Sequence, residues 1–184
     1  MKWRRFAIVA VPALAVAGLL VGLTAEGAIA SSISVSGQEF LITASTFSAN
    51  GFEQFGGSVT NANGEEPVII TAMHQATIDN LCQSVSVGPV TLRLTAGSGS
   101  NPVTADNLIV DASSQTGSVA TFHNITIGQD AGTLSEDPGT TGTSGGFGQQ
   151  ADTFTITNLV QNTWLTTAGT FTLPGLSIGF GSSC

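Results

Sequence analysis

Beyond residue 30, hydrophobic and polar positions alternate in short runs that glycine, serine, threonine and asparagine interrupt. Alternation with a period of two is typical of β-strands with one buried face, and the longer period of an amphipathic helix is almost absent. The pattern predicts strands at 32–36, 39–47, 53–60, 68–78, 90–95, 103–111, 118–127, 152–160, 163–173 and 176–180. We therefore expect an all-β fold, either an antiparallel β-sandwich or an elongated β-roll.

Two segments of the chain echo each other. Residues 77–83 (TIDNLCQ) and 155–161 (TITNLVQ) agree at five of seven positions, and shorter matches surround Asn107 and Asn124. The echo favours a domain of two similar halves, with a short irregular β-solenoid carrying asparagine at its turns as the alternative. Because the asparagines are irregularly spaced, we favour the sandwich or roll.

One stretch departs from the strand pattern. Residues 132–150 are rich in glycine, threonine and serine, and only Leu134 and Phe147 among them are large and apolar. Such a composition predicts a long mobile loop, with a hinge as the alternative. The whole of 31–184 is long enough to bury one core, so we expect a single all-β domain that carries this loop.

The first 30 residues have the composition of an export signal. Lys2, Arg4 and Arg5 precede an uncharged apolar run at 6–22, and a small-x-small cleavage sequence ends at Ala30. We expect cleavage near Ala30 and a mature protein that is secreted or held at the cell surface. Retention of the run as a membrane anchor is the alternative, although its length is at the lower limit for spanning a bilayer.

Charge narrows the range of partners. After residue 30 the chain contains one cation, Arg93, against 11 of its 12 acidic residues, which gives a net charge of about −10. Such a surface cannot neutralise phosphates, so we expect no nucleic-acid partner, and anionic lipid headgroups are poor partners. The predicted edge strands lack the lysines that block edge pairing, which favours self-association or an envelope partner through strand addition. The positive mean hydropathy, +0.31, leaves a lipid ligand as an alternative partner.

The cysteine count favours one covalent link. The chain has two cysteines, Cys82 and the C-terminal Cys184. In an exported protein an even count favours a disulfide, which would tie the C-terminal tail to the middle of the chain. Two free thiols, or an intermolecular bond through Cys184, are the alternatives.

Candidate catalytic residues are few. Two stretches match the G-x-S-x-G pattern of α/β-hydrolase nucleophiles, with Ser144 and Ser177 at the serine position. That motif needs a strand before the serine and a helix after it, a context that neither stretch offers. His74 and His123 lie on the apolar faces of predicted strands, where a packed histidine is more common than a general base. These four residues are the candidate catalytic residues of a serine ester hydrolase. Taken as a whole, the sequence favours a protein that is not an enzyme.

Two short stretches bear a likeness to calcium-binding turns. Residues 145–150 follow the pattern G-G-x-G-x-D except that Gln150 replaces the aspartate, and residues 61–66 resemble a calcium loop. The two cysteines and two histidines have no zinc-ligand spacing. We expect no cofactor, with a structural calcium ion as the alternative.

A further set of motifs extends over much of the chain. It comprises residues 81–84 (LCQS), 90–97 (VTLRLTAG), 102–108 (PVTADNL), 122–131 (FHNITIGQDA) and 147–152 (FGQQAD). Together these motifs resemble a family of secreted actinobacterial proteins of unknown function, whose members often carry the label "cholesterol esterase" in genome annotation. The resemblance implies an exported envelope protein and brings no catalytic motif with it.

Three functions follow from these observations as hypotheses. The first is an exported cell-surface or extracellular-matrix β-protein with a structural or interaction role. The second is a lipid- or sterol-binding β-protein, which co-purification of a lipid would favour. The third is a secreted, cholesterol esterase-like hydrolase of lipid esters, which labelling by a fluorophosphonate probe would favour.

Overall fold

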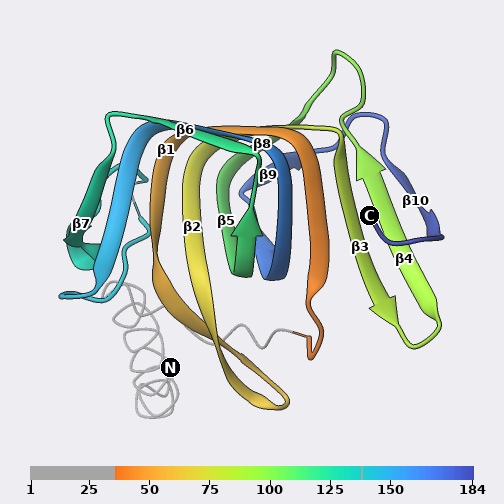
Figure 1. Cartoon of the computed structure of the whole chain (residues 1–184), viewed down its shortest axis with the longest axis horizontal. Helices are drawn as coiled ribbons and strands as arrows, with labels where there is room; N and C mark the ends of the chain where they lie inside the picture. The colour runs from red at the N-terminus through yellow and green to blue at the C-terminus, as the bar shows by residue number, and fades with distance from the viewer. Residues whose placement is uncertain (1–35, 138) are drawn as a thin grey trace, which may run out of the picture. The chain divides into compact units, whose positions relative to one another are not determined.

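The computed structural model describes residues 36–137 and 139–184 (Figure 1). The predicted export signal at 1–30 lies outside these residues, and so does all but the last residue of the strand predicted at 32–36. In the described part the chain forms ten β-strands and one short 3₁₀ helix, η1 (Ala131–Thr133). Within the same residues, no helix is long and apolar enough to span a membrane.

The strands pair antiparallel in every ladder. In chain order they are β1 (Phe40–Asn61), β2 (Gly64–Asp79), β3 (Leu81–Val87), β4 (Val90–Ala96), β5 (Val103–Thr116), β6 (Val119–His123), β7 (Thr126–Asp130), β8 (Phe147–Thr167), β9 (Thr170–Thr172) and β10 (Ser177–Phe180). They form one sheet in the order β10-β4-β3-β1-β2-β5-β8-β6, in which β7 also pairs with β8, β9 with β5, and β8 with β1. The all-β prediction is confirmed, and this curled antiparallel sheet corresponds to the roll rather than to a solenoid.

Strands β1 and β8 are longer than the pattern indicates. β1 joins the strands predicted at 39–47 and 53–60, because Gly51 has a φ of 66° and bends the strand without ending it. β8 likewise runs through the gap predicted between 160 and 163. The pattern gives no strand at 81–87, where the structure places β3, because Gln83 interrupts the apolar face formed by Leu81, Val85 and Val87.

Four asparagines have a left-handed backbone conformation. Asn80, Asn107, Asn124 and Asn158 have φ between 50° and 55°, a region that asparagine and glycine tolerate better than other residues. They are the asparagines of the sequence echoes. Each lies where a strand bends or gives way to the next, and Asn124 divides the strand predicted at 118–127 into β6 and β7.

The bends line up across the sheet in two lines (Figure 1). In the first line, pairing is interrupted at three adjacent positions, Gly51 of β1, His74 of β2 and Asn107 of β5. Beyond β1, Asn124 donates from Nδ2 to Oδ2 of Asp152 on β8 at 2.6 Å. The side-chain amide therefore joins β8 to the connection between β6 and β7 where the backbone ladder stops.

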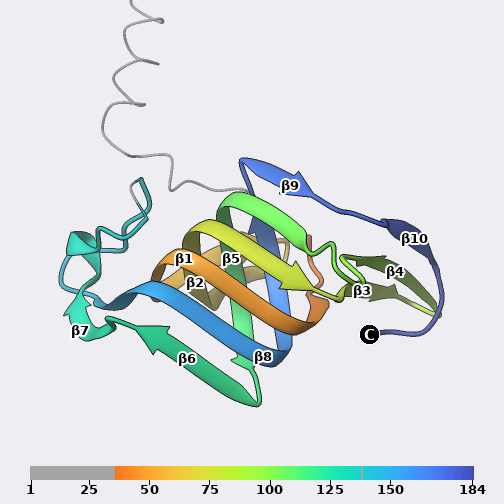
Figure 2. The same cartoon turned by 90° about the horizontal axis from the view of Figure 1, so that it is seen from above.

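The second line passes through Ser45 of β1. Ser45 accepts at Oγ from Nδ2 of Asn80 at 2.9 Å, and pairing with β8 is interrupted opposite Asn158. Asn158 in turn donates from Nδ2 to Oγ of Ser118 at 3.1 Å. We call the part of β1, β2, β5, β6 and β8 between the two lines the strip; seen from above, its strands lie side by side (Figure 2).

The echoed segments occupy equivalent places on the two sides of β1. Ser48 pairs with Thr77 of β2 on one side and with Thr155 of β8 on the other. The same register continues past the second line of bends, so the two seven-residue segments correspond along their whole length. The sequence similarity therefore corresponds to two segments that pair with the central strand β1 in the same register.

The two faces of the strip differ in polarity. On its inner face the rings of Phe122 and Phe154 stack at a centroid distance of 5.3 Å, and Phe47 contacts Phe154 edge-on at 5.6 Å. Phe52, just beyond the first line of bends, packs against both Phe154 and Phe122 at 4.9 Å and 5.3 Å. On its outer face a row of hydroxyl side chains crosses the strip and continues onto β9. The row runs Thr121, Thr155, Ser48, Thr77, Thr104 and Thr172. An apolar core thus lies under an uncharged polar surface.

The segment predicted as a loop at 132–150 ends earlier than expected, because β8 already begins at Phe147. Its buried residues hold it against the sheet. Leu134 and Ala131 pack with Phe55 of β1. The backbone N–H of Asp137 donates to Oε1 of the fully buried Glu53 at 2.7 Å. The mobility of this loop remains a prediction.

The predicted disulfide is confirmed. Cys82 and Cys184 are bonded with their Cα atoms 5.9 Å apart. The backbone N–H of Cys184 also donates to Oγ of Ser84 at 3.1 Å. The bond docks the C-terminal tail beside β3, next to the ladder that β10 forms with β4.

We predict that the left-handed conformation at Asn158 stabilises the fold. Asn158→Ala should lower the free energy of unfolding by about 1–2 kcal/mol, because alanine pays the steric cost of a positive φ. Asn158→Gly should be close to neutral. Asn162→Ala is the matched control, since Asn162 lies on the same strand and makes a similar amide-to-serine bond, to Ser114 at 3.2 Å. Chemical denaturation measures all three, and equal losses in the two alanine variants would contradict the prediction.

We predict that the disulfide contributes strongly to stability. Cys184→Ser should lower the free energy of unfolding by about 2–5 kcal/mol, the usual effect of losing a native disulfide from a small secreted domain. It should also expose β10 to proteolysis, because the tail loses its attachment. A thiol assay on the denatured, unreduced chain checks the premise: two free thiols, or a covalent dimer on a non-reducing gel, would refute it.

Candidate functional site

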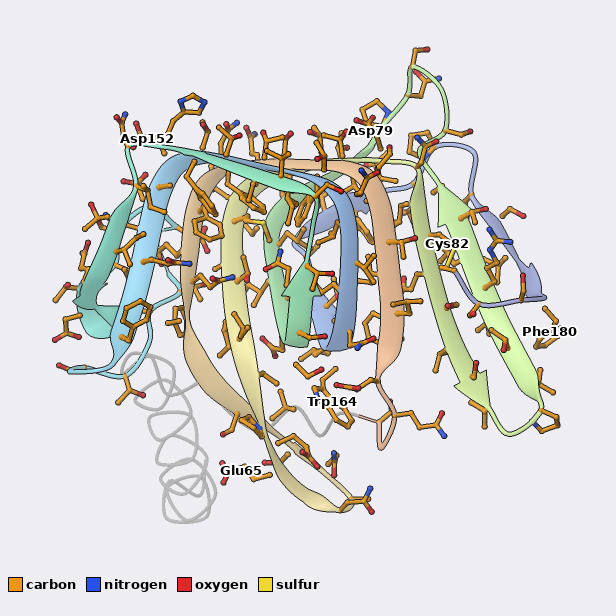
Figure 3. All side chains as sticks on the ribbon, in the orientation of Figure 1. Glu65, Asp79, Cys82, Asp152, Trp164 and Phe180 are labelled. Atoms are coloured by element: carbon orange, nitrogen blue, oxygen red, sulfur yellow. A yellow bond between two sulfur atoms is a disulfide. The ribbon has the colours of Figure 1, made fainter. Side chains whose placement is uncertain are left out.

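A cavity of about 350 Å³ lies beneath the strip and has a mainly apolar lining. Figure 3 places Trp164, one of its lining residues, below the strip and between the descending strands. Strands β1, β2, β3, β5, β8 and β9 all contribute side chains to the wall. The apolar part of the lining comprises Phe40, Ile42, Phe47, Ile78, Leu81, Leu108, Val110, Leu159, Trp164, Leu165, Ala168 and Phe171.

Strand alternation and the second line of bends build this wall. Phe47 and Ile78 point inward from the strip and form its roof. Leu81 and Leu159 directly follow the bend asparagines and lie on the same inner surface. A left-handed residue shifts the alternation of faces, so the residue after each asparagine turns into the interior. The bends thereby direct matching leucines from both echoed segments into the cavity wall.

Three polar side chains interrupt the apolar lining. Gln83 of β3 and Gln161 of β8 both pair in register with Ile42 of β1, one on each side. Gln161 is buried and donates from Nε2 to Oγ1 of Thr163 at 3.2 Å. Thr166 also lines the cavity, and its buried Oγ1 has no hydrogen-bond partner among the described residues. A ligand with one polar group could bond to these amides and this hydroxyl.

Among the residues that the structure describes, no charged side chain belongs to the lining of the cavity. An ionised ligand group would lose its hydration there without gaining an opposite charge, which is strongly unfavourable. The desolvation cost is smaller for an alcohol, ester or amide group, and the two glutamines and Thr166 offer both hydrogen-bond donors and acceptors. The arrangement is therefore suited to binding an apolar molecule with an uncharged polar group.

The cavity residues are not apparent from the sequence pattern. Gln83 and Gln161 are the last positions of the two echoed segments. Each glutamine follows a leucine by two residues and so shares its inward face. A polar residue repeated on an apolar face was the available signal, but only the strand pairing shows that the two glutamines flank Ile42.

The four catalytic candidates lie on separate elements. Ser144 is exposed in the turn before β8, and Ser177 is exposed at the start of β10. His74 lies on β2 and His123 at the end of β6. Among the described residues no hydrogen bond joins either serine to either histidine, and neither serine precedes an α-helix. The structure does not bring them together as a catalytic set.

The expectation that both histidines are packed on apolar faces is wrong, because both are exposed. His74 lies in the first line of bends, where alternation breaks and Met73 takes the buried position instead. His123 shares the outer face with Thr121 and Val119, while Phe122 points to the core. The sequence pattern put the strand faces the wrong way round at β6.

In the two stretches that resemble calcium-binding turns, polar side chains accept hydrogen bonds from backbone N–H groups. Asn61 accepts at Oδ1 from the backbone N–H of Asn63 at 2.7 Å within the hairpin between β1 and β2. Gln150 accepts at Oε1 from the backbone N–H of Ser135 at 2.9 Å. In the part of the chain that the structure describes, no three histidine, cysteine, aspartate or glutamate side chains gather where they could hold a metal ion.

Two buried acids lie in the strands around the cavity. Burial raises the pKa of Asp111 on β5 to about 6. Its backbone pairs with Ile70 and Leu165, and its Oδ1 has no hydrogen-bond partner among the described residues. Burial also raises the pKa of Glu53, against the opposing effect of the backbone N–H groups of Asp137 and Glu136. Folding therefore favours the protonated form of both acids more than the unfolded chain does.

The fold and the cavity define an antiparallel β-protein that surrounds an apolar site with uncharged polar groups. Residues 36–184 match the family described as "Family of unknown function (DUF6230)", and the chain belongs to that family. No match was found among curated proteins. The solved structures likewise include no match to this chain.

We predict that Asp111 makes the fold less stable as pH rises. Its pKa is higher in the folded chain than the ordinary value, so the folded state binds more protons between pH 4 and pH 6, and stability falls across that window. Asp111→Asn should remove this fall and raise the free energy of unfolding at pH 7 by about 1–2 kcal/mol relative to the original chain. Asp106→Asn, at an exposed position of the same strand, is the control. Denaturation at pH 4 and pH 7 measures the difference, and identical pH slopes for Asp111→Asn and the original chain would contradict it.

Proposed function

We propose that this protein is an exported cell-surface or extracellular interaction protein that binds an uncharged lipid in the cavity. The lining carries the proposal: aromatic and aliphatic side chains form the wall, and only Gln83, Gln161 and Thr166 interrupt it. Ligand sites typically combine a mainly apolar wall with a few polar groups that orient the ligand. The disulfide supports an oxidising, extracellular setting.

Size and charge narrow the class of ligand. A cavity of about 350 Å³ is near the lower end of the roughly 300–1,000 Å³ range of ligand sites. It suits one acyl chain or a compact ring system better than a whole diacyl lipid. Because its wall is uncharged, the polar group should be an ester, alcohol or amide. The ligand we propose is a monoacylglycerol, a fatty alcohol or a sterol.

A structural role through strand addition is the second candidate. The sheet ends in β10 on one side and β6 on the other. Neither edge strand carries a lysine, an arginine or an acidic residue. Charged side chains on edge strands normally prevent pairing with another chain. A concentration-dependent increase in mass on analytical ultracentrifugation would favour this candidate.

Trp164 provides a direct test of lipid binding. In a chain carrying Trp3→Phe it is the only tryptophan, and it lines the cavity. A monoacylglycerol brominated on its acyl chain should quench Trp164 fluorescence saturably. The matching brominated fatty acid at pH 8 should bind at least about 10-fold more weakly, because its carboxylate would be desolvated without a partner.

Two variants control this measurement. Ala168→Phe should weaken monoacylglycerol binding at least about 10-fold, because Ala168 lines the cavity and a larger side chain fills it. Thr170→Phe adds the same side chain at an exposed position two residues away and should leave binding unchanged. No quenching by either lipid, or tighter binding of the fatty acid, would overturn the proposal.

A further inference from the structure

One part of the sheet exposes a row of large apolar side chains. Strands β3, β4 and β10, which we call the wing, extend beyond β1 at one end of the sheet order. Their register places Val85, Leu92 and Phe180 in one row across the wing. Phe180 is 79% exposed, Ile178 59% and Leu92 42%, and Figure 3 labels Phe180 at the outer side of the wing. Clustered exposure of this kind marks an interaction surface.

The opposite face of the wing is polar and partly covered. It carries Cys82, Ser84 and Arg93, and the C-terminal tail is bonded to it through the disulfide. Arg93 donates from Nε to Sγ of Cys82 at 3.2 Å. Arg93 is the one cation after residue 30, and it belongs to the face that the apolar row does not share. Within residues 36–137 and 139–184, the wing therefore has one uncovered face, which is apolar and uncharged.

The free face continues into the cavity wall. Ile178 pairs with Leu94, Leu94 with Gln83, and Gln83 with Ile42. Gln83 and Ile42 line the cavity, and Leu94 packs against the main core. One row of side chains thus leads from the edge of the wing to the cavity without meeting a charged residue.

We propose that the apolar face of the wing docks on the surface of an uncharged lipid assembly, from which the cavity takes its ligand. The transfer of ligand rests on the proposed function, whereas the docking does not. The net charge of about −10 after residue 30 favours an uncharged lipid surface over the two other partners that this face could bind. Two copies meeting through this face would bring like charges together, and an anionic bilayer would repel the chain.

The geometry also sets the depth of contact. β10 is the last strand of the sheet order, so one side of its backbone has no ladder partner in the part of the chain that the structure describes. Unpaired backbone groups are excluded from the hydrocarbon interior. The wing therefore lies in the interfacial layer, with side chains such as Phe180 and Ile178 directed into the lipid.

Co-sedimentation with phosphatidylcholine vesicles tests the docking. Ile178→Asp should weaken vesicle binding at least about 10-fold, because a charge replaces an apolar contact. Ser177→Asp is the matched control: it places the same charge one residue away, on the other face, and should change binding less than about twofold. Thermal unfolding should be similar for both variants, since both positions are exposed. Replacing part of the lipid by an anionic one should weaken binding.

Several outcomes would overturn the docking proposal. These are absence of vesicle binding by the original chain, equal loss in the two variants, and stronger binding to anionic vesicles. If the original chain does not bind vesicles but forms a dimer, and Ile178→Asp dissociates that dimer, the face binds a second copy of the chain instead. Trp164 quenching by a soluble monoacylglycerol should persist in Ile178→Asp, so a failure of docking is distinguishable from a failure of cavity binding.

Discussion

Every strand that crosses the strip must change direction at the same two lines, because neighbouring strands keep their backbone hydrogen bonds only if they bend together. The chain meets this constraint with residues that tolerate a positive φ. Gly51 and Asn107 serve the first line, and Asn80 and Asn158 serve the second. The asparagine side chains also replace ladder bonds that the bends remove, as Asn80 does with Ser45. The cavity, the wing and the polar outer face all take their positions from these bends.

Much of the fold can be predicted from the sequence, and the reasons differ between elements. Alternation identifies most strands because one face of the sheet is buried, and an even cysteine count in an exported chain indicates the disulfide. Alternation cannot show that a strand continues through a bend, so β1 appears as two strands. β3 is missed for a different reason, because Gln83 interrupts its apolar face. The cavity escapes prediction for a related reason: Gln83 and Gln161 look like interruptions until the pairing with Ile42 is known.

The distribution of polarity connects stability to the candidate site. The aromatic cluster around Phe154 fills one part of the interior, whereas the part around Trp164 is left open and lined by uncharged groups. Buried acids such as Asp111 lie in the strands around that interior at a cost to stability near neutral pH. The interior is thus densely packed directly under the strip. It contains the cavity where strands β1, β3 and β8 continue past the second line of bends.

The two lines of bends also restrict how the chain length can vary. The step between them is the same in three strands, from Ser45 to Gly51, from His74 to Asn80 and from Asp152 to Asn158. An insertion of one residue in a single strand would turn its side chains to the other face, and an insertion of two would displace its bend from those of both neighbours. The strip can lengthen only if all its strands lengthen together. Insertions and deletions are therefore confined to the hairpin ends and to the loop before β8, where a change in length does not require a matching change in a neighbouring strand.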